Sequence, residues 1–316
     1  MNASLDNSTR SIHSRPWRIE RRIYVIIPVH NRIEYTRSCL RSLYQQTIRH
    51  FDIIVVDDGS TDGTAQMIET EFPKVVLLRG DGNLWWTRAI NTGVRHALTH
   101  KADYIITLND DIILRANFIE EMILQAAENP KALLGGVEID SRTKRPVYGG
   151  KIIDWKLANF NSVLDSLKPE NCHGLHEVNH LPGRELLIPA EVFQRIGLFD
   201  EKNFPQTVAD FDFTYRAYRA GYPIFCNYNA QVETYPDSKG GLELRTRKSL
   251  KNYCNHLFGI KGKGNLNYFI RLGWKNCPKR FVFPFITIGV SKRIFGYLLE
   301  WIIESVRMRR SLKMQG

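Results

Sequence analysis

Four short apolar runs separated by helix-like segments constrain the fold of this chain more than any other feature. The runs cover residues 23–28, 51–56, 75–78 and 104–108, and the segments at 32–46, 64–72 and 87–99 between them are predicted to be helical. Continuous apolar runs are typical of strands that are buried on both faces of a parallel sheet. The alternation therefore predicts an α/β fold, Rossmann-like, with a mostly parallel sheet flanked by helices.

Beyond residue 112 the pattern is less regular. Residues 117–127, 191–196 and 211–220 are predicted helices, and residues 133–139 are a predicted strand. The segment 140–180 between them reads as irregular.

The fourth apolar run ends abruptly in Asn109, Asp110 and Asp111. Open α/β sheets bind ligands at the carboxyl ends of their strands. Adjacent carboxylates repel each other, and a bound cation is a natural reason to place them together. Mg²⁺ takes carboxylate and phosphate oxygens and usually needs only one or two protein acids. The cluster predicts a metal-bridged phosphate ligand, with a polar strand end or helix cap as the plain alternative.

Two further acidic motifs are candidates for chemistry. Asp57 and Asp58 end the second run, where a carboxylate can accept hydrogen bonds from a nucleobase or a ribose, although an ordinary strand-to-helix turn has the same composition. Asp210 and Asp212 alternate with aromatic residues. A partly shielded aspartate can act as a general base, and a helix N-terminus is the competing interpretation.

Charge and cysteine content restrict the classes of protein. Residues 241–316 contain 16 Lys and Arg against three acidic residues, a net charge of +13, whereas residues 1–240 contain 28 against 30, a net charge of −2. A basic region of this kind suits nucleic acid, anionic lipid or a phosphorylated substrate. The five cysteines are scattered without a CxxC pair, and the first residues have no apolar core, so we expect a cytoplasmic protein without a disulfide framework.

Residues 275–313 combine basic and apolar residues. The apolar run 281–290 is only ten residues long and is interrupted by Pro284, and charged residues follow it, which argues against a membrane-spanning helix. A basic amphipathic segment can lie in a membrane interface, so we expect peripheral contact with the cytoplasmic face of a membrane. The alternative is packing against the catalytic domain or a second subunit.

The order of the motifs resembles family 2 glycosyltransferases with the GT-A fold over residues 22–235. The matching runs are Ile26-Ile27-Pro28-Val29-His30-Asn31, Val55-Val56-Asp57-Asp58-Gly59-Ser60, Gly82-Asn83-Leu84-Trp85-Trp86, Asn109-Asp110-Asp111, Gly197-Leu198-Phe199-Asp200 and Ala209-Asp210-Phe211-Asp212-Phe213. Within the family the chain is most similar to rhamnosyltransferase-like enzymes of bacterial surface-polysaccharide assembly.

The resemblance implies an inverting, metal-dependent transfer of a sugar from a nucleoside-diphosphate donor of the dTDP, UDP or GDP type to a saccharide or lipid-linked acceptor. Asp111 would hold Mg²⁺ or Mn²⁺, and Asp210 would be the catalytic base. Donor contacts are expected from Pro28, His30, Asn31, Asp57, Asp58, Gly82, Asn83, Arg88, Asn109 and Asp110. Acceptor contacts are expected from Trp85, Trp86, Arg184, Glu185 and Asp212.

The resemblance also implies a domain plan and leaves rival functions. A flexible lead (1–21) would precede the catalytic domain (22–240, with a nucleotide half 22–112 and an acceptor half 113–240). A basic, partly amphipathic C-terminal region (241–316) would follow as a helical extension. Asn109 and Ala209 stand where the family has acidic residues. A catalytically inactive, glycosyltransferase-like scaffold is therefore an alternative function. A nucleotidyltransferase would usually have a glycine-rich, basic phosphate loop after the first strand, and this chain does not have one there. A nucleic-acid-binding protein is a further alternative, but the sequence contains no recognised nucleic-acid-binding module, so no nucleic acid partner is expected.

Overall fold

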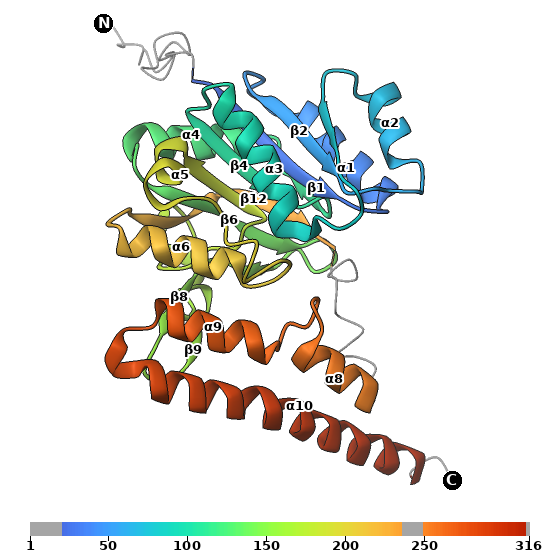
Figure 1. Cartoon of the computed structure of the whole chain (residues 1–316), viewed down its shortest axis with the longest axis vertical. Helices are drawn as coiled ribbons and strands as arrows, with labels where there is room; N and C mark the ends of the chain where they lie inside the picture. The colour runs from blue at the N-terminus through green and yellow to red at the C-terminus, as the bar shows by residue number, and fades with distance from the viewer. Residues whose placement is uncertain (1–20, 236–248, 314–316) are drawn as a thin grey trace, which may run out of the picture.

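The computed structural model describes residues 21–235 and 249–313. The expected flexible lead, apart from Arg21, and the expected domain boundary at residue 240 lie outside the described residues. Within them, a large mixed sheet is covered by helices on both faces, and a layer of C-terminal helices lies on one side (Figure 1).

The first half of the sheet has the predicted parallel arrangement. Its strands are β1 (Ile23–Val29), β2 (Asp52–Asp57), β3 (Val76–Arg79) and β4 (Tyr104–Leu108). They lie in the order β4-β1-β2-β3, and each neighbouring pair is parallel. The residues that follow these four strands therefore meet at one edge of the sheet.

The second half of the sheet is mixed. β11 (Glu185–Pro189) lies antiparallel between β4 and β6 (Leu133–Asp140), and β12 (Ile224–Thr234) runs parallel to β6. β5 (Ile112–Leu114) and β10 (Leu175–Glu177) pair with β12.

The segment 140–180 is more ordered than the sequence predicts. It contains β7 (Pro146–Tyr148), β10 and the hairpin of β8 (Lys151–Asp154) with β9 (Asn159–Ser162), besides the short 3₁₀ turns Leu164–Ser166 and Pro169–Asn171. Strands of three or four residues are too short to display a period of two, so their pattern cannot be recognised in the sequence.

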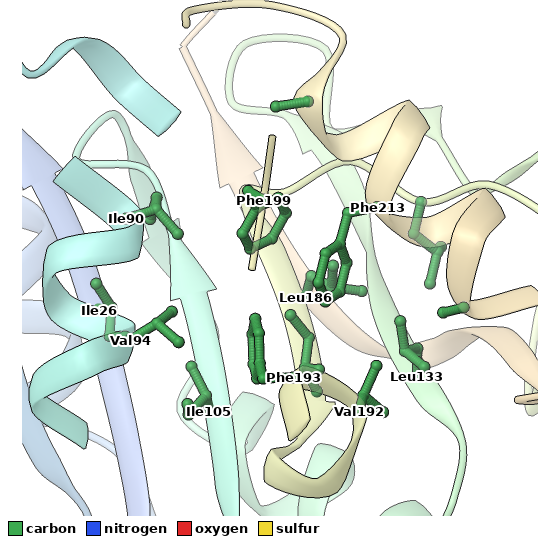
Figure 2. Close-up of a cluster of buried hydrophobic side chains, with 14 of the residues drawn as sticks. Ile26, Ile90, Val94, Ile105, Leu133, Leu186, Val192, Phe193, Phe199 and Phe213 are labelled. Atoms are coloured by element: carbon green, nitrogen blue, oxygen red, sulfur yellow. The ribbon is translucent and has the colours of Figure 1, made fainter. Parts of the chain in front are cut away.

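Helices cover both faces because successive residues of the buried strands point in opposite directions. Ile27 of β1 packs with α1 (Ile33–Tyr44), α2 (Thr64–Glu71) and α4 (Phe118–Glu128). Ile26 faces the other way, toward α3 (Trp85–Thr99), α5 (Ala190–Ile196) and α6 (Ala209–Arg219). Figure 2 shows this second core, where Phe199 and Phe213 stack with ring centroids 4.2 Å apart.

Two helix starts differ from the prediction in a way that matters for the site. α3 begins at Trp85, two residues before the predicted start, and α6 begins at Ala209 instead of Phe211. Asp210 consequently lies in the first turn of α6.

The C-terminal region consists of α8 (Leu250–Phe258), α9 (Leu266–Asn276), the 3₁₀ turn Lys279–Phe281 and α10 (Val282–Lys313). Pro284 does not interrupt the helix, because it lies in the first turn of α10, where its missing N–H is not needed. Lys279–Ile303 is long and apolar enough to cross a membrane by length and composition. The charged residues at 292, 293 and 300 therefore do not exclude a span on those criteria.

A third core attaches the C-terminal helices to the catalytic domain. Trp155 of the β8–β9 hairpin packs against Tyr215 of α6 and Phe285 of α10, with ring centroids 4.6 and 4.8 Å apart. Phe269 of α9 stacks on Phe285. The helical layer is thus packed directly on the helix that carries Asp210.

Candidate active site

The polar residues after the parallel strands gather at the carboxyl-end edge of the sheet, as predicted. The carboxylates of Asp57, Asp58, Asp110 and Asp111 are all buried. Around them, the more exposed residues include His30, Asn31, Gly82 and Asn83. The edge therefore combines a buried acidic floor with a polar, accessible rim, and Pro28 is the last residue but one of β1.

Arg32 bridges the two carboxylates of the acidic cluster. Its Nη1 donates to Asp110 Oδ1 at 2.9 Å and its Nη2 donates to Asp111 Oδ2 at 3.2 Å. Burial raises the pKa of Asp110 to about 7, with the Arg32 charge opposing that shift and the Asp111 charge adding to it. Sequence reasoning missed this contact, because the sequence pattern identifies Arg32 only as the first residue of a predicted helix.

The acidic cluster fits a divalent cation. Asp110 Oδ2 and Asp111 Oδ1 are buried and have no hydrogen-bond partner among the described residues. Carboxylate oxygens are the ligands that Mg²⁺ prefers, and it keeps water and phosphate oxygens in its remaining positions. No group of three His, Cys, Asp or Glu side chains suited to a metal occurs in the described part of the chain. A cation here would accordingly need oxygens from water or from a ligand.

Asp58 organises the turn that leads into α3. Its Oδ1 accepts from the backbone N–H of Gly82 at 2.8 Å, and its Oδ2 accepts from those of Leu84 and Trp85 at 2.9 and 3.1 Å. Both oxygens are therefore engaged by backbone in this structure, although the sequence predicts contact with a nucleotide. The carboxylate also compensates the unpaired N–H groups at the start of the helix.

The neighbouring donor-side residues support the same loop. Asp57 Oδ1 accepts from Ser60 N at 3.0 Å, and His30 Nδ1 lies 2.6 Å from the Asp58 carbonyl oxygen. Asn31 Oδ1 accepts from Thr61 N at 2.7 Å. These contacts connect the ends of β1 and β2 and shape the rim.

Trp86 connects the acidic cluster to Asp210. Its indole Nε1 donates to Asn109 Oδ1 at 2.9 Å. A Cβ at Gly183 would lie 2.4 Å from the Trp86 ring and 3.5 Å from Asp210 Cβ, so only glycine fits between them. Two candidate residues that are distant in sequence are therefore packed through a single glycine, which sequence reasoning did not identify.

Asp210 lies at the start of α6 in a desolvated position. Burial raises its pKa, while the N–H groups of Phe211 and Gly183 and the charge of Arg184 oppose the shift. Phe211 N lies 3.0 Å from Oδ1 and Gly183 N lies 3.3 Å from Oδ2. A carboxylate with a raised pKa is suited to accept a proton near neutral pH.

Arg184 and Glu185 form a buried ionic group beside the site. Arg184 Nε lies 2.8 Å from Glu138 Oε1 and 3.8 Å from Glu185 Oε2. The pKa of Arg184 is raised: burial opposes that shift, and the charges of Glu138, Glu185 and Asp111 outweigh it. Glu138 was not predicted, because a single glutamate in the apolar strand β6 gives no recognisable motif.

Three predicted site residues have other contacts in the structure. Asp212 is fully buried and is bonded to Arg216, Lys275 and Asn276, so it connects α6 to the end of α9. Arg88 is largely exposed, with Nε 3.8 Å from Glu201 Oε1. Trp85 lies under Lys261, whose Nζ is 5.7 Å from the ring centroid.

Known proteins resemble the chain in sequence and in fold. An uncharacterized glycosyltransferase of Rickettsia felis is 30% identical over 258 residues, which cover 75% of this chain and 37% of that protein. One from Rickettsia prowazekii is 29% identical over 208 residues, covering 62% and 58% of the two chains. The chain thus spans only part of the length of these relatives.

A solved structure shares the fold at low sequence identity. The crystal structure of GalNAc-T7 with UDP, GalNAc and Mn2+ superposes with a TM-score of 0.57 at 16% identity, covering 82% of this chain and 52% of that one. Residues 24–188 match the model of the family described as Glycosyl transferase family 2. With that match over half of its length and with a GT-A fold, the chain belongs to glycosyl transferase family 2.

Proposed function

We propose that the chain is an inverting, metal-dependent glycosyltransferase that moves a sugar from a nucleoside-diphosphate donor to an acceptor hydroxyl. The observation that carries the proposal is the position of Gly183 between Asp210 and Trp86, since Trp86 is hydrogen-bonded to Asn109 in the acidic cluster. This arrangement connects a desolvated base with a cation-binding edge.

Asp111, with Asp110 beside it, would hold Mg²⁺ or Mn²⁺ through the carboxylate oxygens that no residue in the described part of the chain contacts by a hydrogen bond. The cation supplies positive charge that offsets the charge of the departing nucleoside diphosphate. The rim residues and the loop held by Asp58 would contact the nucleotide.

Asp210 would accept the proton of the acceptor hydroxyl as that oxygen attacks the anomeric carbon and the bond to the diphosphate breaks. One base is enough, because a single displacement forms no covalent glycosyl-enzyme. Trp86, held by Asn109, offers an aromatic face to sugar C–H groups. Arg184, whose charge acts on both Asp111 and Asp210, lies where it would contact the sugar or the acceptor.

The finer assignment rests on the resemblance of the motifs. We propose a bacterial polysaccharide or glycolipid pathway, with rhamnose as the sugar, a dTDP, UDP or GDP donor, a saccharide or lipid-linked acceptor, and a location at the cytoplasmic face of the membrane. The basic C-terminal region supports an anionic, lipid-linked acceptor through charge complementarity.

The test is binding and hydrolysis of a panel of nucleotide sugars, including dTDP-rhamnose, with Mg²⁺ or Mn²⁺. We expect one donor to bind with metal and to be slowly hydrolysed. Asp111→Ala should abolish metal-dependent binding, and Asp210→Asn should bind donor without turnover. Glu128→Gln, on the exposed side of α4, is the control and should behave as wild type. If no nucleotide sugar binds with either metal, an inactive scaffold replaces the proposal.

A further inference from the structure

The outward face of α10 exposes large apolar side chains. Phe283, Phe295, Leu299 and Ile302 are 79%, 65%, 59% and 61% exposed. At 3.6 residues per turn these positions fall within about half of the helix circumference. Large exposed apolar side chains that share one helix face mark a surface that meets another apolar phase.

The opposite face of α10 is packed against the protein. Phe285 is fully buried and stacks on Phe269 of α9, and Gly289 also lies against the ring of Phe269. Nearer the C-terminus, Tyr297 packs on Tyr253 of α8, with ring centroids 5.0 Å apart. A membrane-spanning orientation would expose this packed face to lipid and separate α10 from its partners. The packing therefore favours a helix that lies along a surface.

Charge selects the kind of surface. Residues 241–316 carry a net charge of +13. Lys279 and Arg280 are exposed just before Phe283, and Lys251 and Lys263 are exposed in the same helical layer. A second copy of the chain would bring an equal positive charge and be repelled, whereas an anionic lipid surface is attracted. The apolar face and the charge around it thus match the two phases of a membrane interface.

We propose that α10 docks this outward face in the interface of an anionic phospholipid bilayer, with the helix axis parallel to the membrane plane. The apolar side chains enter the region between headgroups and acyl chains, and the neighbouring Lys and Arg side chains contact lipid phosphates. α9 lies between α10 and α6, so the catalytic domain is held on the side away from the lipid (Figure 1).

The docked layer also positions Asp210. Asp212 Oδ1 lies 2.9 Å from Asn276 Nδ2 and 2.9 Å from Lys275 Nζ, and these residues end α9. Because Asp210 and Asp212 share α6, the proposed base is held at a fixed offset from the bilayer. The use of this offset to meet a lipid-linked acceptor rests on the proposed function, whereas docking itself does not.

The test is co-sedimentation of the full chain with vesicles of phosphatidylcholine alone or mixed with phosphatidylglycerol. We expect binding to the anionic vesicles only, weakened by high salt. Phe295→Glu and Leu299→Glu should each reduce partitioning by about tenfold or more, because each removes a large apolar side chain from the interface. Ile152→Glu, at an exposed apolar position on the catalytic domain, is the matched control and should leave partitioning to the anionic vesicles unchanged.

Three outcomes would overturn the proposal: no binding of the wild type to anionic vesicles, binding that the α10 variants do not change, or protein retained in the membrane after alkaline carbonate extraction, which indicates a span. If light scattering shows a dimer that Phe295→Glu dissociates without changing vesicle binding, the face belongs to a second copy. Thermal unfolding checks that the variants fold. Donor binding, measured without vesicles, separates failure of docking from failure of the proposed reaction.

Discussion

Replacing Asp58 by asparagine tests whether this buried carboxylate organises the loop before α3 or is reserved for the nucleotide. The carboxylate accepts three backbone N–H groups, those of Gly82, Leu84 and Trp85. Asparagine has the same shape but only one acceptor oxygen, and its amide nitrogen would face a donor.

The cost follows from these contacts. The best orientation of asparagine keeps its oxygen on the N–H groups of Leu84 and Trp85 and loses the bond to Gly82. A hydrogen bond to a charged group contributes about 1.5–3 kcal/mol, and the unpaired donors add to the loss. Asp58 is buried, so water does not readily replace the bond. We expect the free energy of unfolding to fall by about 2–3 kcal/mol.

Urea unfolding followed by tryptophan fluorescence measures this change. With a slope of about 3 kcal/mol/M for a chain of this size, the midpoint should fall on the order of 0.5–1 M. Asp81→Asn is the matched control, because Asp81 is exposed and asparagine retains an oxygen for Asn83 N. Wild-type stability combined with lost nucleotide binding in Asp58→Asn would refute the reasoning.

Two further predictions concern charge at the site. Because burial raises the pKa of Asp210 above its ordinary value of 3.8 and only the ionised form accepts a proton, kcat/KM should rise with pH through a midpoint above that value; a pH–rate profile flat across the acid range contradicts this. Arg32→Gln removes the cation that bridges Asp110 and Asp111. At pH 8 it should strengthen binding of Mn²⁺ alone by at least about tenfold in paramagnetic resonance titrations. Arg41→Gln is the control. An unchanged Mn²⁺ affinity in Arg32→Gln would show that Arg32 does not influence the cation site.

Local sequence was sufficient to predict the nucleotide half of the fold. Apolar strands and polar strand ends have short-range signatures, so β1 to β4 and the acidic edge around Asp58 and Asp111 were predicted close to their observed positions. The C-terminal helix was predicted, but the interruption by Pro284 was not observed, because the position of a proline relative to the helix start decides whether it interrupts the helix.

The partners of the site residues were decided by the tertiary structure alone. Arg32 contacts Asp110, 78 residues away in the turn after β4, and Gly183 is confined between Trp86 and Asp210, because the sheet order brings these segments together. Asp212 shows the limit of sequence reasoning. Its motif resembles that of an active-site acid, yet the rotation of a helix between positions 210 and 212 turns one carboxylate to Gly183 and the other to Asn276 of α9. The sequence by itself determined which chemical groups are present and at which strand ends they lie, whereas packing determined which of those groups act together.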